Sequence, residues 1–287
     1  TVTAGAATGV TISAATVPGT ITVTGCTTIS AYGVEYSTTA SFANGTGTPI
    51  GGSNLSGGSF SVALSGLATG TTFYYHTYAT NAAGTSYSAE GSFTTLTPTL
   101  SVDALTGFGN VCTGTTAGPN TFTITGTNLS PADVTVAALS GFTYSTDDIT
   151  YFSSLTISQP GGSFSQLIYV KFSPTLVQSY SGDIAIGGAG AASINRSVTA
   201  IGINTPVSVT TGSSSGITQV AATLNGTLTL GCSGLSAYGI EYSTTNGFVN
   251  GTGTQAASSN LSAGSFSSTL SSLDPGVTYY FKAYATD

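Results

Sequence analysis

The 287 residues are enough for two or three domains that each bury a core, and a hydrophobic share of 40% argues against a disordered chain. Three Lys and Arg against ten Asp and Glu give a formal net charge of −7, which excludes a nucleic-acid partner because phosphate groups require clustered cations. No apolar run approaches the roughly 18 residues of a membrane-spanning helix, so we expect no membrane insertion.

Residues 1–96 alternate apolar and hydroxyl side chains, which is the period-two pattern of half-buried β-strands. The pattern predicts strands over 2–23, 60–67, 72–80 and 87–95, with a Gly-, Asn- and Ser-rich loop region over 41–59. In the strand over 72–80, alternation directs one set of side chains inward: Phe73, Tyr75, Thr77 and Ala79. The other set is expected outside: Tyr74, His76, Tyr78 and Thr80.

An internal repeat organises the chain. Residues 25–81 align without a gap on residues 231–287, and 34 of the 57 positions are identical. The most similar stretch is Ala-Tyr-Gly-Val/Ile-Glu-Tyr-Ser-Thr-Thr, at 31–39 and again at 237–245. Alternation directs Tyr32, Val34 and Tyr36 to the core and leaves Glu35 exposed. The repeat therefore predicts two copies of one domain on either side of a different unit.

The end of the repeat resembles a known family. Residues 273–279, Leu-Asp-Pro-Gly-Val-Thr-Tyr, together with Asn-Ala-Ala-Gly-Thr-Ser at 81–86, are similar to the E–F corner and F–G hairpin of fibronectin type III domains. In that family a Tyr hydroxyl at this corner bonds to nearby backbone. The resemblance implies such a bond for Tyr279, whereas Phe73, its equivalent in the first copy, has no hydroxyl.

A different unit begins at Thr97-Pro98. Strand-like runs follow at 121–126, 134–139, 151–158, 164–173, 181–187 and 192–203. Several short strands at this spacing predict another sandwich. Residues 169–174, Tyr-Val-Lys-Phe-Ser-Pro, and 179–184, Ser-Tyr-Ser-Gly-Asp-Ile, resemble immunoglobulin-like repeats of large secreted bacterial surface proteins. Alternation of such units with fibronectin-like ones resembles the stalks of adhesins that Bacteroidota export through the type IX route.

We therefore predict an all-β fold, with three tandem immunoglobulin-like and fibronectin III-like β-sandwiches in a rod. The expected domains are a fibronectin III-like sandwich over 1–96, an immunoglobulin-like sandwich over 97–204 and a second fibronectin III-like sandwich over 205–287. Short linkers with one Pro each favour semi-rigid connections. Because Asp287 is equivalent to Asn81, we expect the third sandwich to lack its last strand and the chain to be a piece of a longer protein.

Three cysteines leave an odd count. Cys26 and Cys232 are equivalent in the repeat and lie in different domains, so they are poorly placed to pair with each other. Two interpretations stay open: isolated thiols, or an interdomain or interchain bridge such as Cys26 with Cys112. Metal binding has no support, because no second Cys or His stands at ligand spacing.

The sequence contains no catalytic constellation and no cofactor site, so we predict that the chain is not an enzyme. His76 is the only histidine, and Lys282 occupies the equivalent position. A catalytic base needs a nucleophile or a partner carboxylate in reach. We instead expect Glu35 to pair with His76 and Glu241 to pair with Lys282, as exposed cross-strand ion pairs worth about 0–1 kcal/mol.

Four tyrosines are expected on the outer face of the repeated strand: Tyr74, Tyr78, Tyr280 and Tyr284. Such a ladder either packs against a neighbouring strand or domain, or offers a platform for sugar rings or for another copy of the chain. Asp147-Asp148 lies in the one carboxylate-rich part of the chain. A hairpin turn is the preferred interpretation, because calcium requires six to eight oxygens at one place.

These features favour a non-catalytic structural repeat segment of a long secreted cell-surface adhesin or extracellular filament. The expected partners are other copies of the same chain or repeat, joined through open strand edges. The alternative is a carbohydrate-binding accessory module of a secreted polysaccharide-degrading enzyme, with glycan held on Tyr74 and Tyr78. Both place the chain outside the cell or at its surface.

Overall fold

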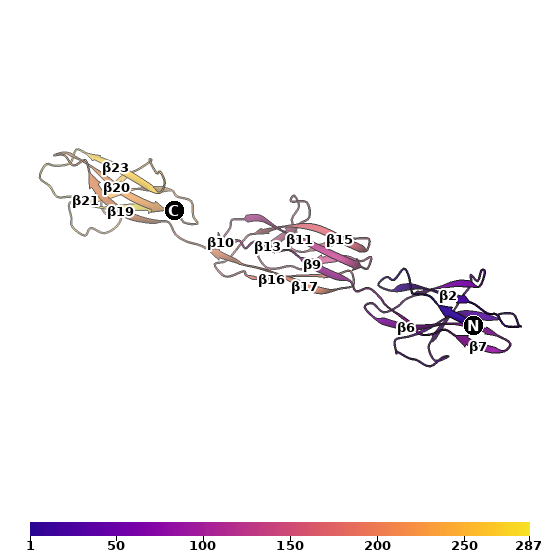
Figure 1. Ribbon diagram of the computed structural model, residues 1–287. Helices are drawn as coiled ribbons and strands as arrows, with labels where there is room; N and C mark the ends of the chain where they lie inside the picture. The colour runs from indigo at the N-terminus through magenta and orange to yellow at the C-terminus, as the bar shows by residue number, and fades with distance from the viewer.

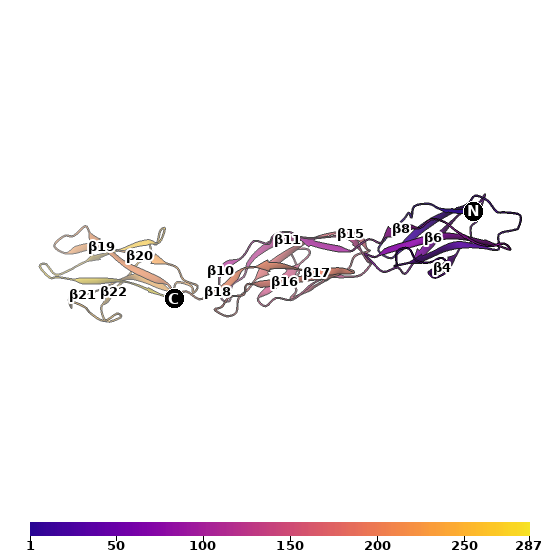
Figure 2. The same cartoon turned by 60° about the horizontal axis from the view of Figure 1, so that its bottom comes forward.

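The computed structural model describes residues 1–287 and consists of strands and loops. Three β-sandwiches follow one another along a rod, as both views show (Figures 1 and 2). The predicted all-β fold with tandem sandwiches is confirmed. The chain has no helix of the length and hydropathy needed to cross a membrane.

The first sandwich packs a three-stranded sheet against a five-stranded one. The orders are β1-β2-β5 and β4-β3-β6-β7, and β8 also pairs with β6. Apolar residues alternate along β2 and β5 and meet in pairs such as Val17 and Val62, which are both buried. The strands are β1 Val2–Ala4, β2 Ala14–Ile21, β3 Ala31–Ser37, β4 Thr48–Gly51, β5 Ser59–Ser65, β6 Thr72–Asn81, β7 Gly84–Tyr87 and β8 Gly91–Thr94.

The second sandwich packs the sheet β13-β15-β11-β9 against the sheet β14-β12-β16-β17. At one end, β10 and β18 form a parallel pair that places Cys112 opposite Ile203. The strands are β9 Thr99–Val102, β10 Gly109–Cys112, β11 Ala117–Leu129, β12 Val134–Val136, β13 Phe142–Ser145, β14 Leu155–Ile157, β15 Gly162–Phe172, β16 Gly182–Gly188, β17 Ala191–Val198 and β18 Ala200–Ile203.

The third sandwich repeats the first with fewer strands. Its sheets have the orders β19-β20-β23 and β22-β21-β24. No strand pairs with β24 on the edge where β7 and β8 pair with β6 in the first copy. The strands are β19 Ser208–Ser215, β20 Ala221–Thr229, β21 Ala237–Ser243, β22 Thr254–Ala257, β23 Ser265–Ser271 and β24 Tyr280–Thr286.

Three expected strands are each divided in two. The run over 2–23 forms the antiparallel strands β1 and β2, and the run over 87–95 falls at the end of β7 and in β8. The run over 192–203 divides at Thr199, because β17 pairs with β16 whereas β18 pairs with β10. Continuous alternation predicted a strand correctly in each place, but it does not reveal where the chain changes its pairing partner.

Each sandwich has its own hydrophobic core. The cores contain 13 buried residues in the first, 20 in the second and five in the third. The third core is smaller than its repeat-equivalent because β24 lacks neighbours on one edge, so Phe281 is only partly buried where Tyr75 is buried. The edge of β24, which has no paired strand, and the two junctions between sandwiches are therefore the parts of this fold where a functional surface is sought.

Candidate functional site

The repeated Glu35 holds a loop instead of pairing on the surface. The Glu35 side chain is 2% exposed, and its carboxylate accepts hydrogen bonds from the backbone N–H groups of Gly45, at 2.9 Å, and Gly47, at 2.5 Å. A Cβ at Gly47 would lie 2.6 Å from the Phe42 ring and 2.8 Å from the Tyr36 carbonyl oxygen, so only glycine allows this approach.

Glu241 repeats the arrangement in the third sandwich. It is 2% exposed and accepts hydrogen bonds from Gly251, at 3.0 Å, and Gly253, at 2.6 Å. The expectation that Glu35 and Glu241 are exposed is therefore wrong. Strand alternation placed both on the outer face of the sheet, but it could not show that a loop covers that face. The predicted core positions of Tyr32, Val34 and Tyr36 are confirmed.

The expected ion pairs are also wrong, although the strand register is right. Glu35 lies opposite His76, and Glu241 lies opposite Lys282. His76 is buried, with Nδ1 3.0 Å from the Ser88 carbonyl oxygen and Nε2 3.9 Å from a carboxylate oxygen of Glu90. Because that carbonyl can only accept, Nδ1 of His76 carries the hydrogen. His76 thus joins two segments and has no nucleophile within reach.

Lys282 ties down the equivalent loop by other contacts. Its ammonium group donates to the Phe248 carbonyl oxygen at 2.6 Å and to Oδ1 of Asn250 at 2.9 Å. The same nitrogen lies 4.6 Å from the centre of the Phe248 ring, within cation–π range. His76 and Lys282 therefore both support the loop that the repeated glutamate anchors, and neither forms an exposed pair with that glutamate.

The outer tyrosines do not form an uninterrupted ladder in the first sandwich. Tyr74 and Tyr78 are half-buried, and between them His76 is covered by the Phe42 ring, at a centroid distance of 4.8 Å. The Tyr87 ring of β7 lies 6.2 Å from Tyr78. Tyr280 and Tyr284 are partly buried as well, and Tyr280 lines a shallow hollow with Phe248, Lys282 and Asn246.

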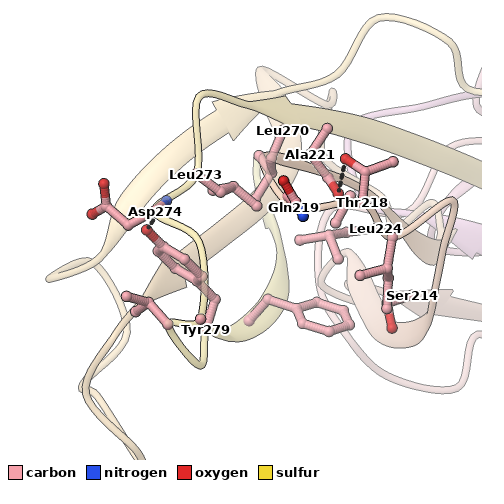
Figure 3. Close-up of a pocket in the computed structure, with 14 residues that line it drawn as sticks. Ser214, Thr218, Gln219, Ala221, Leu224, Leu270, Leu273, Asp274 and Tyr279 are labelled. Atoms are coloured by element: carbon pink, nitrogen blue, oxygen red, sulfur yellow. Dashed lines mark hydrogen bonds between the residues drawn. The ribbon is translucent and has the colours of Figure 1, made fainter.

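The corner bond implied by the family resemblance is confirmed. The backbone N–H of Asp274 donates to the Tyr279 hydroxyl oxygen at 3.1 Å (Figure 3). The second sandwich has a similar corner, in which the N–H groups of Thr175 and Leu176 donate to the Tyr180 hydroxyl oxygen at 3.1 and 2.9 Å. Both tyrosines fix a loop that crosses from one sheet to the other.

An apolar hollow of about 320 Å³ opens beside Tyr279 in the third sandwich (Figure 3). Its lining includes Leu224, Leu270, Leu273 and Phe281. In the first sandwich, β8 places Phe93 at the equivalent position, with its ring stacked on Phe73 at a centroid distance of 5.7 Å and tilted against Tyr75 at 6.0 Å. The hollow therefore corresponds to the space that Phe93 of β8 fills in the first sandwich.

The junction between the second and third sandwiches is crossed by a disulfide. Cys112, at the end of β10, is bonded to Cys232, with Cα atoms 5.3 Å apart. The interdomain interpretation of the cysteines is thus right, but the example pair Cys26 with Cys112 is wrong, since Cys26 is free and exposed. The linker packs on the same place, because the N–H of Cys232 donates to the Thr205 carbonyl oxygen at 2.7 Å.

The two aspartates form a turn, as expected. The Asp147 carboxylate accepts hydrogen bonds from the Ser145 hydroxyl, at 2.7 Å, and from the N–H groups of Ile149 and Thr150, both at 2.9 Å. These donors, the Ser145 hydroxyl first, lower the pKa of Asp147 from 3.8 to about 2. No group of three or more His, Cys, Asp or Glu residues is placed to hold a metal ion.

No protein-family model and no curated protein matches the chain. Among solved structures, it is similar to the FN1–FN3 domains of chicken CNTN1, at 14% identity over 99% of this chain and 91% of that one, with a TM-score of 0.29. It is also similar to domains of titin, at 15% identity over 99% and 91%, with a TM-score of 0.29. A third structure is the Escherichia coli adhesin FdeC, at 13% identity over 100% and 92%, with a TM-score of 0.28. The sandwich fold itself rests on the strand pairing described above.

Proposed function

We propose that the chain is a non-catalytic structural repeat segment of a long secreted cell-surface adhesin or extracellular filament, of the kind that Bacteroidota export through the type IX route. The observation that carries the proposal is the junction at Cys112–Cys232, where a disulfide and a peptide linker cross side by side. Two attachments resist bending and twisting, which is useful in a stalk. A disulfide also suits an oxidising location outside the cell.

The arrangement of polar side chains supports a structural role over catalysis. Glu35, Glu241, His76 and Lys282 are all engaged in holding loops. A hydrolytic site would instead combine a nucleophile or paired carboxylates with a free cavity. With their polar groups engaged by the fold, the sandwiches act as spacers.

The edge of β24 is where we propose that a strand from another copy of the chain or repeat is added. No strand pairs with this edge within residues 1–287, although the N–H of Ala283 already donates to the Thr211 hydroxyl of β19 at 2.9 Å. The other backbone groups of the edge can bond an added strand, and the hollow beside Tyr279 accepts an apolar side chain from that strand. A low density of charge offers little repulsion against such contact, since only 5% of residues are charged.

Sedimentation and electron microscopy of the purified chain under reducing conditions test the assembly. We expect concentration-dependent association, which Phe281→Asp abolishes by placing a charge in the hollow. Val249→Asp is the control, because Val249 is exposed and does not line this hollow. Rods that stay monomeric at high concentration would remove assembly from the proposal and leave the spacer role.

Glycan binding is a second candidate, favoured by the hollow of about 380 Å³ lined by Tyr280, Phe248 and Lys282. Aromatic rings beside amide and ammonium donors are the chemistry that sugar rings require. A glycan array with the folded chain tests it, and Tyr280→Ala should then abolish binding. The variant Tyr74→Ala with Tyr78→Ala tests the first sandwich in the same way. An array without signal excludes this function.

A further inference from the structure

Both copies of the repeat contain a Gly-Cys turn, at Gly25–Cys26 and at Gly231–Cys232. In the third sandwich the linker covers this turn, because a Cβ at Gly231 would lie 2.3 Å from the Thr205 carbonyl oxygen and 2.5 Å from the Pro206 carbonyl carbon. In the first sandwich a Cβ at the equivalent Gly25 would meet only the side chain of Asn81, at 3.4 Å. Cys26 is exposed beside a hollow of about 470 Å³.

Cys26 lies at the end of the first sandwich that points away from the second. Strand β6 begins near Leu96, which leads into the second sandwich, and ends at Asn81, whose amide donates to the Thr24 carbonyl oxygen at 3.0 Å. Cys232 lies at the equivalent end of the third sandwich, where the second sandwich contacts it. The Gly25–Cys26 turn therefore lies on the surface of the first sandwich whose equivalent in the third sandwich is joined to the second sandwich.

We propose that Cys26 is half of a disulfide joint, and that it bonds the cysteine equivalent to Cys112 in another copy of the second sandwich. That copy lies end-on at the Gly25–Cys26 turn, as the second sandwich of this chain does at the Gly231–Cys232 turn. The inference rests on the proposed array of repeats. Its independent support is the bond that the repeat-equivalent Cys232 already forms with Cys112.

The bond formation is an ordinary oxidation. The two thiols lose two protons and two electrons, and a disulfide oxidant such as oxidised glutathione is reduced to two thiols. Within one chain Cys112 is already bonded to Cys232. Copies of the unaltered chain are therefore not expected to join by Cys112, because the neighbouring Cys232 competes at high effective concentration.

The variant Cys232→Ser frees Cys112 and leaves Cys26, so each molecule carries both halves of the joint. In a glutathione redox buffer we expect a ladder of linear head-to-tail oligomers on a non-reducing gel. Mass spectrometry should find the Cys26–Cys112 peptide in clear excess over the two symmetric disulfides combined. Random pairing between molecules would make those amounts equal.

Two matched variants complete the test. The variant Cys112→Ser keeps Cys26 and Cys232, which are repeat-equivalent and belong to the same half of the proposed joint. We therefore expect this variant to form few oligomers. Cys26→Ser with Cys232→Ser should yield no ladder beyond a dimer. Random pairing in the folded Cys232→Ser variant, with circular dichroism and proteolysis unchanged, would overturn the inference. Association through the edge of β24 is measured under reducing conditions, where no disulfide forms. Its outcome is therefore independent of the outcome of this disulfide test.

Discussion

Cys112 and Cys232 are 120 residues apart in sequence, yet their Cα atoms lie 5.3 Å apart across the junction of two sandwiches. The polypeptide crosses the same junction beside them, where Thr205 accepts a hydrogen bond from Cys232. The junction at Thr97-Pro98 has no such bond, and its linker is held by weaker contacts such as the Asn128 amide to the Thr97 carbonyl oxygen at 3.4 Å. The rod thus combines one doubly attached joint with one singly attached joint.

The buried glutamate of the repeat should dominate the stability of its loop. Glu35→Ala leaves the N–H groups of Gly45 and Gly47 without an acceptor, so we expect the free energy of unfolding of the first sandwich to fall by about 2–4 kcal/mol. Denaturant unfolding, with hydrogen exchange to assign the change to the first sandwich, measures it. Glu90→Ala is the control, since Glu90 is partly exposed and accepts one backbone bond, from Ser41. Equal effects of the two variants would contradict this role.

The turn at Asp147 should weaken in acid. Its pKa is lowered to about 2 by the Ser145 hydroxyl and two backbone N–H groups, so the folded chain holds the proton less tightly than the unfolded chain. The contribution of the carboxylate is therefore present above about pH 4 and is lost as the pH falls through about 2. Carbon-13 NMR titration of the carboxyl groups checks the value. Asp147→Asn should remove this pH dependence, and an ordinary titration midpoint would refute the account.

The tyrosine corner should stabilise the third sandwich by a modest amount. Tyr279→Phe keeps the ring and removes the acceptor for the Asp274 N–H, and it reproduces the residue found in the first copy at Phe73. We expect a loss of about 1 kcal/mol, the usual net value of one hydrogen bond. Thermal unfolding measures it, with Tyr284→Phe as the control because its hydroxyl has no protein partner at this corner. Matching losses in both variants would argue against the corner bond.

Sequence pattern predicted the strands well but not their surroundings. Alternation placed Phe73 and Tyr75 in the core, and the fibronectin type III resemblance placed Glu35 on the strand next to His76. It failed for the environment of Glu35, because the loop over 42–47 that folds back on this residue after β3 has no periodic signal. The spacing Gly-Thr-Gly at 45–47, repeated at 251–253, was the available hint, since two glycines allow backbone to approach a carboxylate.

The pairing of Cys112 with Cys232 could not be predicted from the sequence, for a different reason. The repeat showed that Cys26 and Cys232 occupy equivalent positions in different domains and so do not pair with each other. The partner of Cys112, however, depends on which end of a sandwich contacts its neighbour. The order of the sandwiches along the rod decides this. The unpaired edge of β24 within residues 1–287, by contrast, was expected from comparing the two copies, because the residues equivalent to β7 and β8 would lie beyond Asp287.

A spacer with one locked joint should bend at one junction only, and the bend angles of single rods measure this. Negative-stain electron microscopy can measure the angle at each junction in the same particles, so the junction at Thr97-Pro98 serves as an internal control. We expect a narrow range of angles at the Cys112–Cys232 junction, and a wider range in the double variant Cys112→Ser with Cys232→Ser. Equally wide bending at both junctions of the unaltered, oxidised chain would contradict it.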